Sequence, residues 1–435
     1  MEKDNKKTIN AWCMYDWANS VYSLTITTAV FPEYFLAVTT GKGGEDLVNF
    51  LGYTIKNSVL YSYSLSSIFL ISALISPFIT SIADYTGKKK TLMGAFCYLG
   101  AFSCASLYFF KADVLSLGVF AFILAGVGYS GSIVLYNSYL PEIASESQYD
   151  RVSARGFSMG YIGSVILLVL NLAMITQPQV FGIPAESGGL AARISFLTVG
   201  IWWFVFAQYS FFNLPRDKKK NSDGHWLLNG WRELAKVWEG MKSLRLTKLF
   251  LAGFFLYSMG VQTVMYVAPL FAKKVLGLET GNLIVTILII QLVAIPGAAF
   301  FNYVSGRSGN ILALVVGIVV WILICVGAYF VQKGLSFYIL ASAIGFVMGG
   351  IQSLSRATYS KLIPENTTKA ASWFSFYDVT EKLSIVLGTF AYGFIEDVTG
   401  TMRNSVIALG IFFILGLLFI LRIPSRKIYA VKNPV

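Results

Sequence analysis

The sequence predicts an all-α integral membrane protein, with twelve transmembrane helices in two pseudo-symmetric six-helix bundles. Hydrophobic residues make up 56% of the 435-residue chain and charged residues only 13%, whereas soluble domains carry about 25% charged residues. Apolar runs of about 20 residues, long enough to cross a bilayer, recur along the whole chain. Two short motifs also recur at nearly the same offset, which indicates an internal duplication.

The apolar runs are continuous rather than alternating, so they indicate helices and not strands. We expect spans at residues 17–39, 57–82, 91–110, 114–136, 157–176, 194–213, 249–272, 282–304, 311–331, 336–358, 371–394 and 403–421. The first run has the full length of a span and no A-x-A-like cleavage site follows it. We therefore expect it to remain in place as an uncleaved first helix.

The two repeated motifs lie on either side of the long polar stretch 214–248. Asp84-Tyr-Thr-Gly87 follows the second expected span and Gly306-Arg-Ser-Gly309 follows the eighth, and their final glycines are 222 residues apart. Leu140-Pro141-Glu142 follows the fourth span and Ile363-Pro364-Glu365 follows the tenth, at an offset of 223. Two unrelated motifs at nearly one offset indicate a duplicated six-helix unit.

The polar stretch divides the chain into an N-terminal bundle (1–213), a cytoplasmic linker (214–248) and a C-terminal bundle (249–435). Within the linker, apolar side chains follow one helical face and basic side chains occupy the others. The apolar face consists of Leu227, Trp231, Leu234, Trp238 and Met241. This pattern, within 225–248, predicts an amphipathic helix that lies on the membrane surface. A helix that binds a soluble partner is the alternative.

The formal net charge of +12 does not indicate a nucleic-acid-binding protein, because of where the basic residues fall. With the N-terminus inside, most Lys and Arg residues lie in or beside the inner loops, and only Lys382 is placed within a span. This asymmetry is the positive-inside pattern, so we expect both termini in the cytoplasm. The basic loops would contact anionic lipid of the inner leaflet of the bilayer. A bacterial-type inner or plasma membrane is the expected location.

No arrangement of residues in the sequence indicates catalysis or metal binding. The four cysteines lack the spacing of a disulfide framework or a metal site, and His225 is the sole histidine. Gly126-x-Gly128-x-x-Gly131 matches a dinucleotide-binding pattern, but it lies inside an apolar run with no strand before it. Those glycines instead predict close packing of helices. We therefore expect no enzyme activity, no cofactor and no metal.

Polar residues in the first span are candidates for a substrate path, because an ionisable side chain at mid-membrane costs about 2.5–3.5 kcal/mol. Asp16 starts a polar stripe on one helical face, and Asn19 lies beside it. The stripe continues through Ser20, Ser23 and Thr27. One interpretation is that Asp16 and Asn19 line the inner end of the path. The other is that they cap the N-terminus of the helix.

The eleventh span carries the most charge. Asp378 and Lys382 are four residues apart and can pair on one helical face, which leaves Glu381 as the unmatched acid. A buried acid without a full partner can exchange a proton near neutral pH. We expect Glu381 and Lys382 to serve in coupling or substrate contact, and the alternative is a structural pair with another helix. Other polar groups expected on the path are Tyr22, Asn137, Tyr257, Ser258, Gln262, Tyr266 and Gln352.

The loop after the second span is a candidate gate. Asp84, with Gly87, Lys88 and Lys89, is expected to hold the inner ends of helices together through contacts to a helix terminus. Arg155, at the start of the fifth span, could meet a substrate carboxylate or a neighbouring acid. We expect it to brace the loop that carries Leu-Pro-Glu.

The loop 80–89, with twelve spans in two repeats and a basic central loop, resembles the major facilitator superfamily. The signature of that loop is usually written G-x-L-A-D-R-x-G-R-K. Here Thr80 stands in place of its first Gly and Tyr85 in place of its first Arg. The second copy of the loop, around Gly306, lacks the acid.

A more specific resemblance covers nearly the whole chain. Tyr15-Asp16-Trp17-Ala18-Asn19-Ser20, followed by Phe31-Pro32, is similar to the first helix of the vacuole effluxer-like family. That family comprises relatives of the autophagy-linked amino-acid exporter of fungal vacuoles. Further similar stretches are 137–141, 155–163, 362–365 and 377–382. In this family we expect an acid where this chain has Met259; if that acid carries protons in the relatives, proton coupling here differs or is absent.

The resemblance implies a secondary transporter that moves a small polar organic solute by alternating access, with amino acids as the leading substrate class. Transport would be facilitated or proton-coupled, with the lipid bilayer, the solute and protons as the partners of a monomer. Two alternatives remain at this point. One is an exporter of drugs or metabolites, which would have a largely apolar cavity. The other is a non-transporting membrane sensor or scaffold that acts through the 225–248 helix.

Overall fold

The computed structural model describes residues 3–41, 44, 46–184, 189–218, 226–278, 280–332, 334–364, 367 and 369–424. Its long helices are α1 (Lys6–Val21), α2 (Phe31–Thr39), α3 (Asn57–Thr86), α4 (Lys89–Ser106), α5 (Leu115–Asn137), α7 (Tyr149–Thr176), α8 (Leu190–Asn213), α9 (Trp226–Ser243), α10 (Arg245–Leu276), α11 (Thr280–Ser308), α12 (Asn310–Phe330), α13 (Gly334–Leu362), α14 (Ala370–Thr399) and α15 (Met402–Leu421). Short helices are α6 (Leu140–Ile143), η2 (Leu107–Phe109), η3 (Ala112–Val114), η4 (Glu146–Gln148) and η5 (Pro178–Phe181).

Eleven helical stretches in the described part of the chain are long and apolar enough to cross a membrane. They overlap eleven of the expected spans. The remaining expected span, 371–394, lies within α14, which is 30 residues long. Its hydropathy is reduced by Asp378, Glu381 and Lys382. α14 packs against α3, α10 and α15, and its length fits a twelfth span.

The first span begins earlier than the sequence predicts. α1 starts at Lys6, and the side chain of Asn5 caps it by accepting from the backbone amides of Lys7 and Thr8. The span continues through a π-helical segment, η1 (Tyr22–Val30), and ends with α2. Asp16 therefore lies within α1, about three turns from its start. The interpretation of Asp16 as a helix cap is wrong, because polar residues before position 17 also join the helix.

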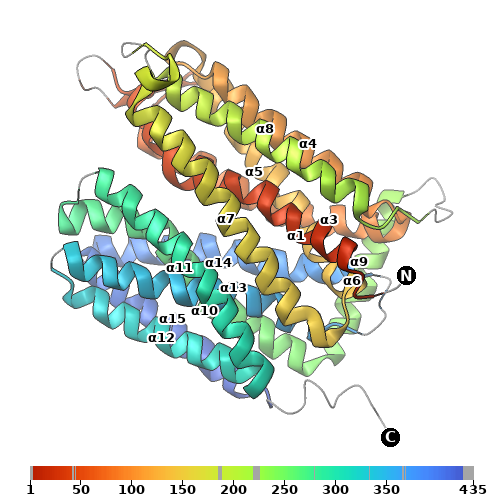
Figure 1. Cartoon of the computed structure of the whole chain (residues 1–435). Coiled ribbons are helices and arrows are strands. Elements are labelled where there is room, and N and C mark those ends of the chain that lie inside the picture. The colour runs from red at the N-terminus through yellow and green to blue at the C-terminus, as the bar shows by residue number, and fades with distance from the viewer. Residues whose placement is uncertain are drawn as a thin grey trace, which may run out of the picture.

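Two groups of helices are visible in Figure 1. In the N half (α1–α8), α1 packs against α7 and α8, and α4 packs against α5 and α8. In the C half (α10–α15), α11 packs against α13, and α10 packs against α14 and α15. Across the boundary, α3 contacts α14, and α7 contacts α11 and α13. The sites below lie along these contacts.

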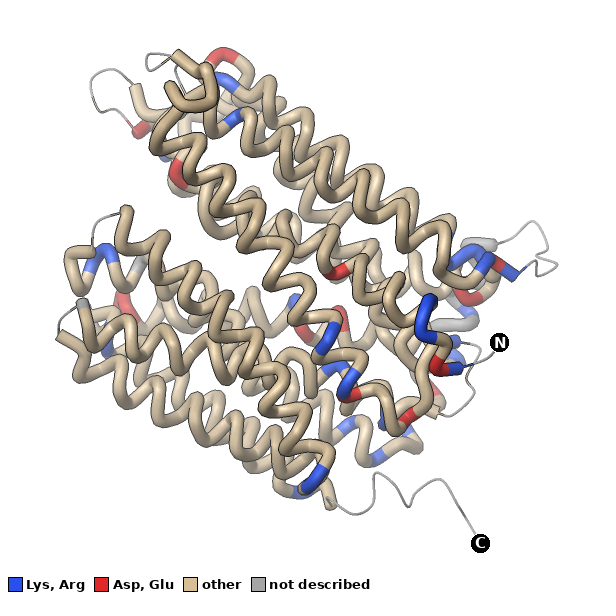
Figure 2. The backbone as a smooth tube through the Cα atoms, viewed as in Figure 1, with Lys and Arg blue, Asp and Glu red and all other residues tan. Residues whose placement is uncertain are grey.

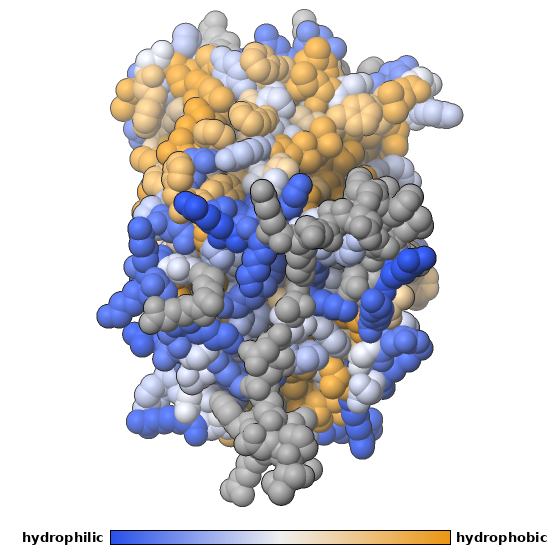
Figure 3. All heavy atoms as spheres, turned by 90° about the vertical axis from the view of Figure 1, so that its right-hand side faces the viewer, coloured by the Kyte–Doolittle hydropathy of each residue, from blue (hydrophilic) through white to orange (hydrophobic). Residues whose placement is uncertain are grey.

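Basic residues collect at one end of the molecule, which also holds the N-terminus (Figure 2). We call it the basic end; it includes the starts of α1, α4, α7, α10 and α14 and the ends of α3, α11 and α13. Figure 3 looks toward this side and shows hydrophilic side chains across its middle and lower part, with hydrophobic ones above. The positive-inside rule predicts that the basic end faces the cytoplasm.

The linker helix α9 packs against α3, α10 and α14. Val237 and Met241 are buried there. Trp238 stacks on Phe376 of α14 with ring centroids 5.7 Å apart, yet it remains 53% exposed. α9 therefore rests on helices of both halves, through a face slightly rotated from the expected stripe. His225 and the side chains of Leu227, Trp231 and Leu234 lie outside the described residues.

Two local features complete the fold. A short antiparallel hairpin of β1 (Leu47–Phe50) and β2 (Tyr53–Lys56) joins α2 to α3, which the all-α prediction did not include. The glycine pattern in α5 serves packing, as expected: Gly128 lies against the backbone of Gly100 in α4 so closely that a Cβ would clash. It therefore allows α4 and α5 to approach.

Candidate functional site

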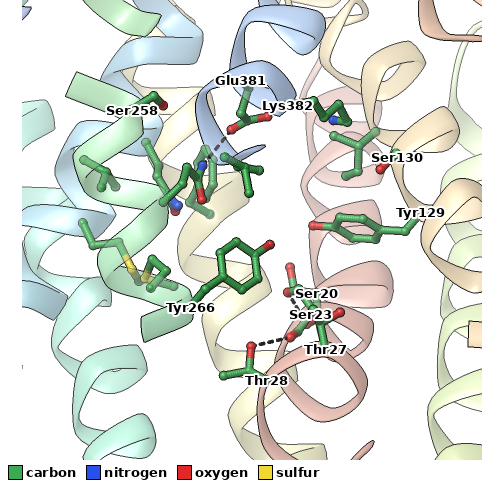
Figure 4. A pocket seen from close by; sticks show the side chains of 18 of the residues that line it. Ser20, Ser23, Thr27, Thr28, Tyr129, Ser130, Ser258, Tyr266, Glu381 and Lys382 are labelled. Carbon is green, nitrogen blue, oxygen red and sulfur yellow. Dashed lines mark hydrogen bonds between the residues drawn. The ribbon is translucent and has the colours of Figure 1, made fainter. Parts of the chain in front are cut away.

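A cavity of about 230 Å³ lies between the two halves. Its walls come from α1, η1, α3, α5 and α7 on one side and from α10, α11, α13 and α14 on the other. In Figure 4, Tyr129 and Tyr266 approach the open space from opposite sides, with Glu381 beyond them. The polar lining comprises Asp16, Ser20, Tyr22, Ser23, Thr27, Thr28, Tyr129, Ser130, Asn137, Tyr161, Ser164, Tyr257, Ser258, Gln262, Tyr266, Gln291, Gln352, Ser355, Arg356, Tyr377, Glu381 and Lys382.

Most of the path residues expected from the sequence line this cavity. They are Asp16, Tyr22, Asn137, Tyr257, Ser258, Gln262, Tyr266, Gln352, Glu381 and Lys382. Asn19 and Asp378 do not line it. The Asn19 side chain is fully buried, and its amide atoms have no hydrogen-bond partner among the described residues. Asn19 lies next to the stripe but is buried away from the cavity, so the expectation that it lines the path is wrong.

The polar stripe of the first span enters a π-helical segment. Thr28 Oγ1 donates to the backbone oxygen of Ser23 at 2.8 Å, and Ser23 Oγ donates to the backbone oxygen of Ser20 at 3.0 Å (Figure 4). Asp16, Ser20, Ser23 and Thr27 all line the cavity. Segments of π-helix are frequent at functional sites, and this one forms part of the cavity wall.

The three charges of α14 divide into a pair and a single acid. Lys382 Nζ lies 2.5 Å from Asp378 Oδ1, and both side chains are buried. Glu381 Oε1 accepts a hydrogen bond from Gln262 Nε2 of α10 at 3.1 Å. Glu381 makes no ion pair with any described residue. The cavity therefore contains a carboxylate held by an amide and available to a cationic group.

Arg356 of α13 is a buried cation in the cavity wall that the sequence reasoning missed. Its side chain is 3% exposed and pairs with Asp16 Oδ2 of α1 at 3.4 Å. The charge count assigned Arg356 to the inner loops because it lies near the end of a span. Its position inside the expected span 336–358 was the signal that could have identified it, since a charge there needs a partner.

A second buried network joins the halves at the basic end. Asp150, in the first turn of α7, accepts from Lys361 Nζ at 2.8 Å, from Asn310 Nδ2 at 2.7 Å and from Ser305 Oγ at 3.1 Å. These three donors belong to α13, α12 and α11 respectively. Lys361 also donates to Asn310 Oδ1 at 2.7 Å. One carboxylate thus connects α7 to three helices of the C half.

Asp84 makes the corresponding contact in the first copy of the repeat. Its carboxylate accepts from the backbone amides of Ser372 at 2.6 Å and Ala371 at 3.4 Å, in the first turn of α14. Asp150 and Ser372 are 222 residues apart, the offset of the duplication. In the second copy the loop after α11 lacks an acid, and Asp150 supplies one from the opposite helix. The Asp84 and Asp150 contacts are therefore related by the duplication. In the first the acid lies at the end of α3, and in the second it lies at the start of α7.

The remaining residues expected to act as a gate differ in their contacts and exposure. Gly87 ends α3 with a φ of 69°, a left-handed conformation that glycine adopts without strain. Lys89 pairs with Glu142 at 2.5 Å, while Lys88 is exposed. Arg155 is exposed on α7 and makes no hydrogen bond or ion pair with the described residues. The expectation that Arg155 braces the Glu142 loop is wrong, because Lys89 takes that role.

The described residues contain no group of three or more His, Cys, Asp or Glu side chains that could hold a metal ion. The four cysteines are buried and free. The lining of the cavity offers hydrogen-bonding and charged side chains.

A protein-family model described as vacuole effluxer Atg22 like matches residues 4–430. This chain belongs to the vacuole effluxer Atg22-like family. The uncharacterized MFS-type transporter YxiO of Bacillus subtilis (strain 168) is 32% identical over 428 residues, covering 98% of this chain and 97% of that protein. Autophagy-related protein 22-1 of Aspergillus terreus (strain NIH 2624 / FGSC A1156) is 26% identical, covering 87% of this chain and 75% of that protein.

Solved structures share the fold of this family member. The transporter FucP in the outward conformation has a TM-score of 0.70 at 13% identity, covering 96% of this chain and 98% of that one. The proton:xylose symporter XylE bound to 6-bromo-6-deoxy-D-glucose has a TM-score of 0.68 at 13% identity, covering 98% of each chain. The expected fold class and family are confirmed. The chain is a multi-pass membrane transporter of the major facilitator superfamily, and not an enzyme.

Proposed function

We propose that this transporter moves a small polar organic solute through the cavity by alternating access, with amino acids as the leading substrate class. The observation that carries the proposal is the charged lining. Glu381 is a carboxylate without an ion-pair partner among the described residues, while Arg356 and Lys382 are cations in the same wall. Such groups are costly within a membrane, which favours a role in the transport path.

Alternating access requires that the contacts between halves at the basic end open and close. The polar contacts that cross there include Asp84 with the start of α14, Asp150 with α11, α12 and α13, and Arg356 with Asp16. At the other end the described residues have one ion pair between halves, Glu33 with Lys273 at 3.6 Å, and both side chains are about half exposed. This distribution supports a state that is closed at the basic end.

Proton coupling would act through Glu381. Met259 of α10 is buried and cannot titrate, and Glu381 approaches the same helix through Gln262. A carboxylate that exchanges its hydrogen-bond partner for a proton or a solute ammonium group could link the two movements. Facilitated transport without protons is the other form of the same proposal.

The test is uptake into proteoliposomes of a panel of labelled amino acids, sugars, polyamines, monocarboxylates and apolar drugs, with and without a proton gradient. We expect uptake of amino acids above that of protein-free liposomes. Uptake of apolar drugs alone would support a drug exporter, which the polar lining disfavours. No flux of any panel member by purified, folded protein would contradict the proposal and favour a sensor or scaffold that acts through α9.

A further inference from the structure

We propose that Arg356, positioned by Asn137 and Ser153, is a carboxylate-binding subsite in the cavity wall, which Asp16 occupies as an internal anion until a substrate carboxylate replaces it. The subsite rests on the proposed transport function and specifies its substrate. The solute would carry both a carboxylate and an ammonium group.

The guanidinium group of Arg356 is firmly positioned on one side. Nε donates to Ser153 Oγ at 2.9 Å, Nη2 donates to the Ser153 backbone oxygen at 2.9 Å, and Nη1 donates to Asn137 Oδ1 at 3.2 Å. Aromatic rings enclose it, with Phe157 at 4.2 Å and Trp12 at 4.6 Å from the guanidinium carbon. A planar fork held in this way is suited to bind a carboxylate through two parallel hydrogen bonds.

The contacts of Arg356 with Asp16 are long by comparison. Nη1 and Nη2 both point to the single atom Asp16 Oδ2, at 3.4 Å each. Charge-assisted hydrogen bonds of this kind are normally about 2.7–2.9 Å. Asp16 is therefore a weak partner for the fork, and a better-placed carboxylate would gain hydrogen-bond energy by replacing it.

The Asp16 carboxylate keeps a hydrogen-bond donor when its contact with Arg356 is broken. Tyr136 donates to its Oδ2 at 2.6 Å, and that bond does not depend on Arg356. Its other oxygen, Oδ1, accepts no hydrogen bond from any described residue, although the side chain is only 7% exposed. Gly156 lets the pair pack closely against α7, since a Cβ there would clash with Asp16 Oδ2, and on its other side Asp16 lines the cavity. The carboxylate of Asp16 thus borders the cavity and keeps the Tyr136 hydroxyl as a donor.

The charges around the cavity determine what accompanies the carboxylate. Arg356 and Asp16 cancel, as do Lys382 and Asp378, which leaves Glu381 as the unmatched charge. A solute that brings only an anion would add a second unmatched negative charge, which is costly away from water. A zwitterion avoids this cost, because its ammonium group can pair with Glu381 while its carboxylate binds Arg356.

The experiment measures binding to the purified protein by calorimetry, with glycine, L-alanine, L-leucine and L-lysine as probes. Each is compared with its own carboxamide, which keeps the ammonium group and lacks the carboxylate. We expect at least one amino acid to bind about tenfold or more tightly than its amide. Equal affinities, or no binding of any probe, would overturn the subsite.

Two variants and a control assign the effect to Arg356. Arg356→Lys keeps the charge and removes the fork, and we expect the preference over the amide to fall to about threefold or less. Asp16→Asn removes the internal competitor, and we expect amino acids to bind about tenfold more tightly. A merely damaged protein would not bind more tightly, so weaker binding to Asp16→Asn overturns the role of Asp16. Arg422→Lys, on an exposed residue at the end of α15, should keep the wild-type preference.

Failure of the subsite and failure of the transport function give different results. If proteoliposomes take up sugars or polyamines as readily as amino acids, the proposed transport function is supported and the carboxylate subsite is contradicted. If amino acids bind with the expected preference but no solute crosses the membrane, the subsite is supported and the proposed transport function is contradicted.

Discussion

Replacing Asp150 by Asn should shift the transporter toward states in which the basic end is open. Asp150 joins α7 of the N half to Lys361, Asn310 and Ser305 of the C half, and it is buried. Opening of the basic end must break these bonds, whereas opening of the other end need not. The variant therefore destabilises one set of conformations and leaves the others unchanged.

The magnitude follows from the bonds that are lost. The hydrogen bond from Lys361 to Asp150, at 2.8 Å, is between charged groups, and such bonds contribute about 1.5–3 kcal/mol. The amide that Asp150→Asn introduces would keep one oxygen as an acceptor for Asn310 or Ser305, so much of the neutral hydrogen bonding survives. Since Lys361 also loses its buried counter-charge, the change is at least about 2 kcal/mol, which corresponds to a shift of roughly thirtyfold or more in the equilibrium between closed and open states.

Pulsed electron–electron resonance between spin labels would detect the shift. Ser147 and Ser308 are exposed at the basic end, on the N and C halves respectively, and can be changed to cysteine for labelling. The native cysteines are buried, so the introduced ones should react first. We expect Asp150→Asn to populate longer distances, while Asp113→Asn, on an exposed acid at the other end, should not. An unchanged distance distribution in folded Asp150→Asn protein would refute the role of Asp150 in holding the basic end closed.

Three further predictions concern α14 and α9. Glu381→Gln should abolish the dependence of uptake on a proton gradient without lowering the melting temperature; uptake that still follows the gradient would exclude Glu381 from coupling. Asp378→Asn should destabilise the protein by about 3–5 kcal/mol, because it leaves Lys382 buried without its counter-charge, and adding Lys382→Met should restore the melting temperature. Met241→Ala should lower the melting temperature by several degrees through lost packing of α9, whereas Ser243→Ala, on an exposed residue, should not.

The spans could be predicted because each is a continuous apolar run long enough to cross a bilayer, which is visible in the local sequence. The pairing of Asp378 with Lys382 could be predicted for the same reason, since residues four apart share a helical face. The start of the first span could not, because the polar residues between Lys6 and Asp16 interrupt the apolar run although they belong to the same helix.

The contacts that join the two halves could not be predicted from the sequence. Arg356 and Asp16 are 340 residues apart, and Lys361 and Asp150 are 211 apart. No local pattern relates such residues, because their approach depends on how helices of the two halves pack. The duplication indicated which loops correspond, but it did not show that the acid missing from the second copy is supplied by Asp150. The π-helical winding of η1 likewise has no signature in the residues themselves.

Blockage of the cavity tests the central claim most directly, namely that solute crosses the membrane through the space between the halves. Ser130 lines the cavity and is 5% exposed (Figure 4). A Ser130→Cys variant would be treated in proteoliposomes with a bulky thiol reagent, and uptake of labelled amino acids would be measured before and after. The account predicts that modification stops uptake and that excess unlabelled amino acid slows modification. Full uptake after complete modification of the introduced thiol would contradict it.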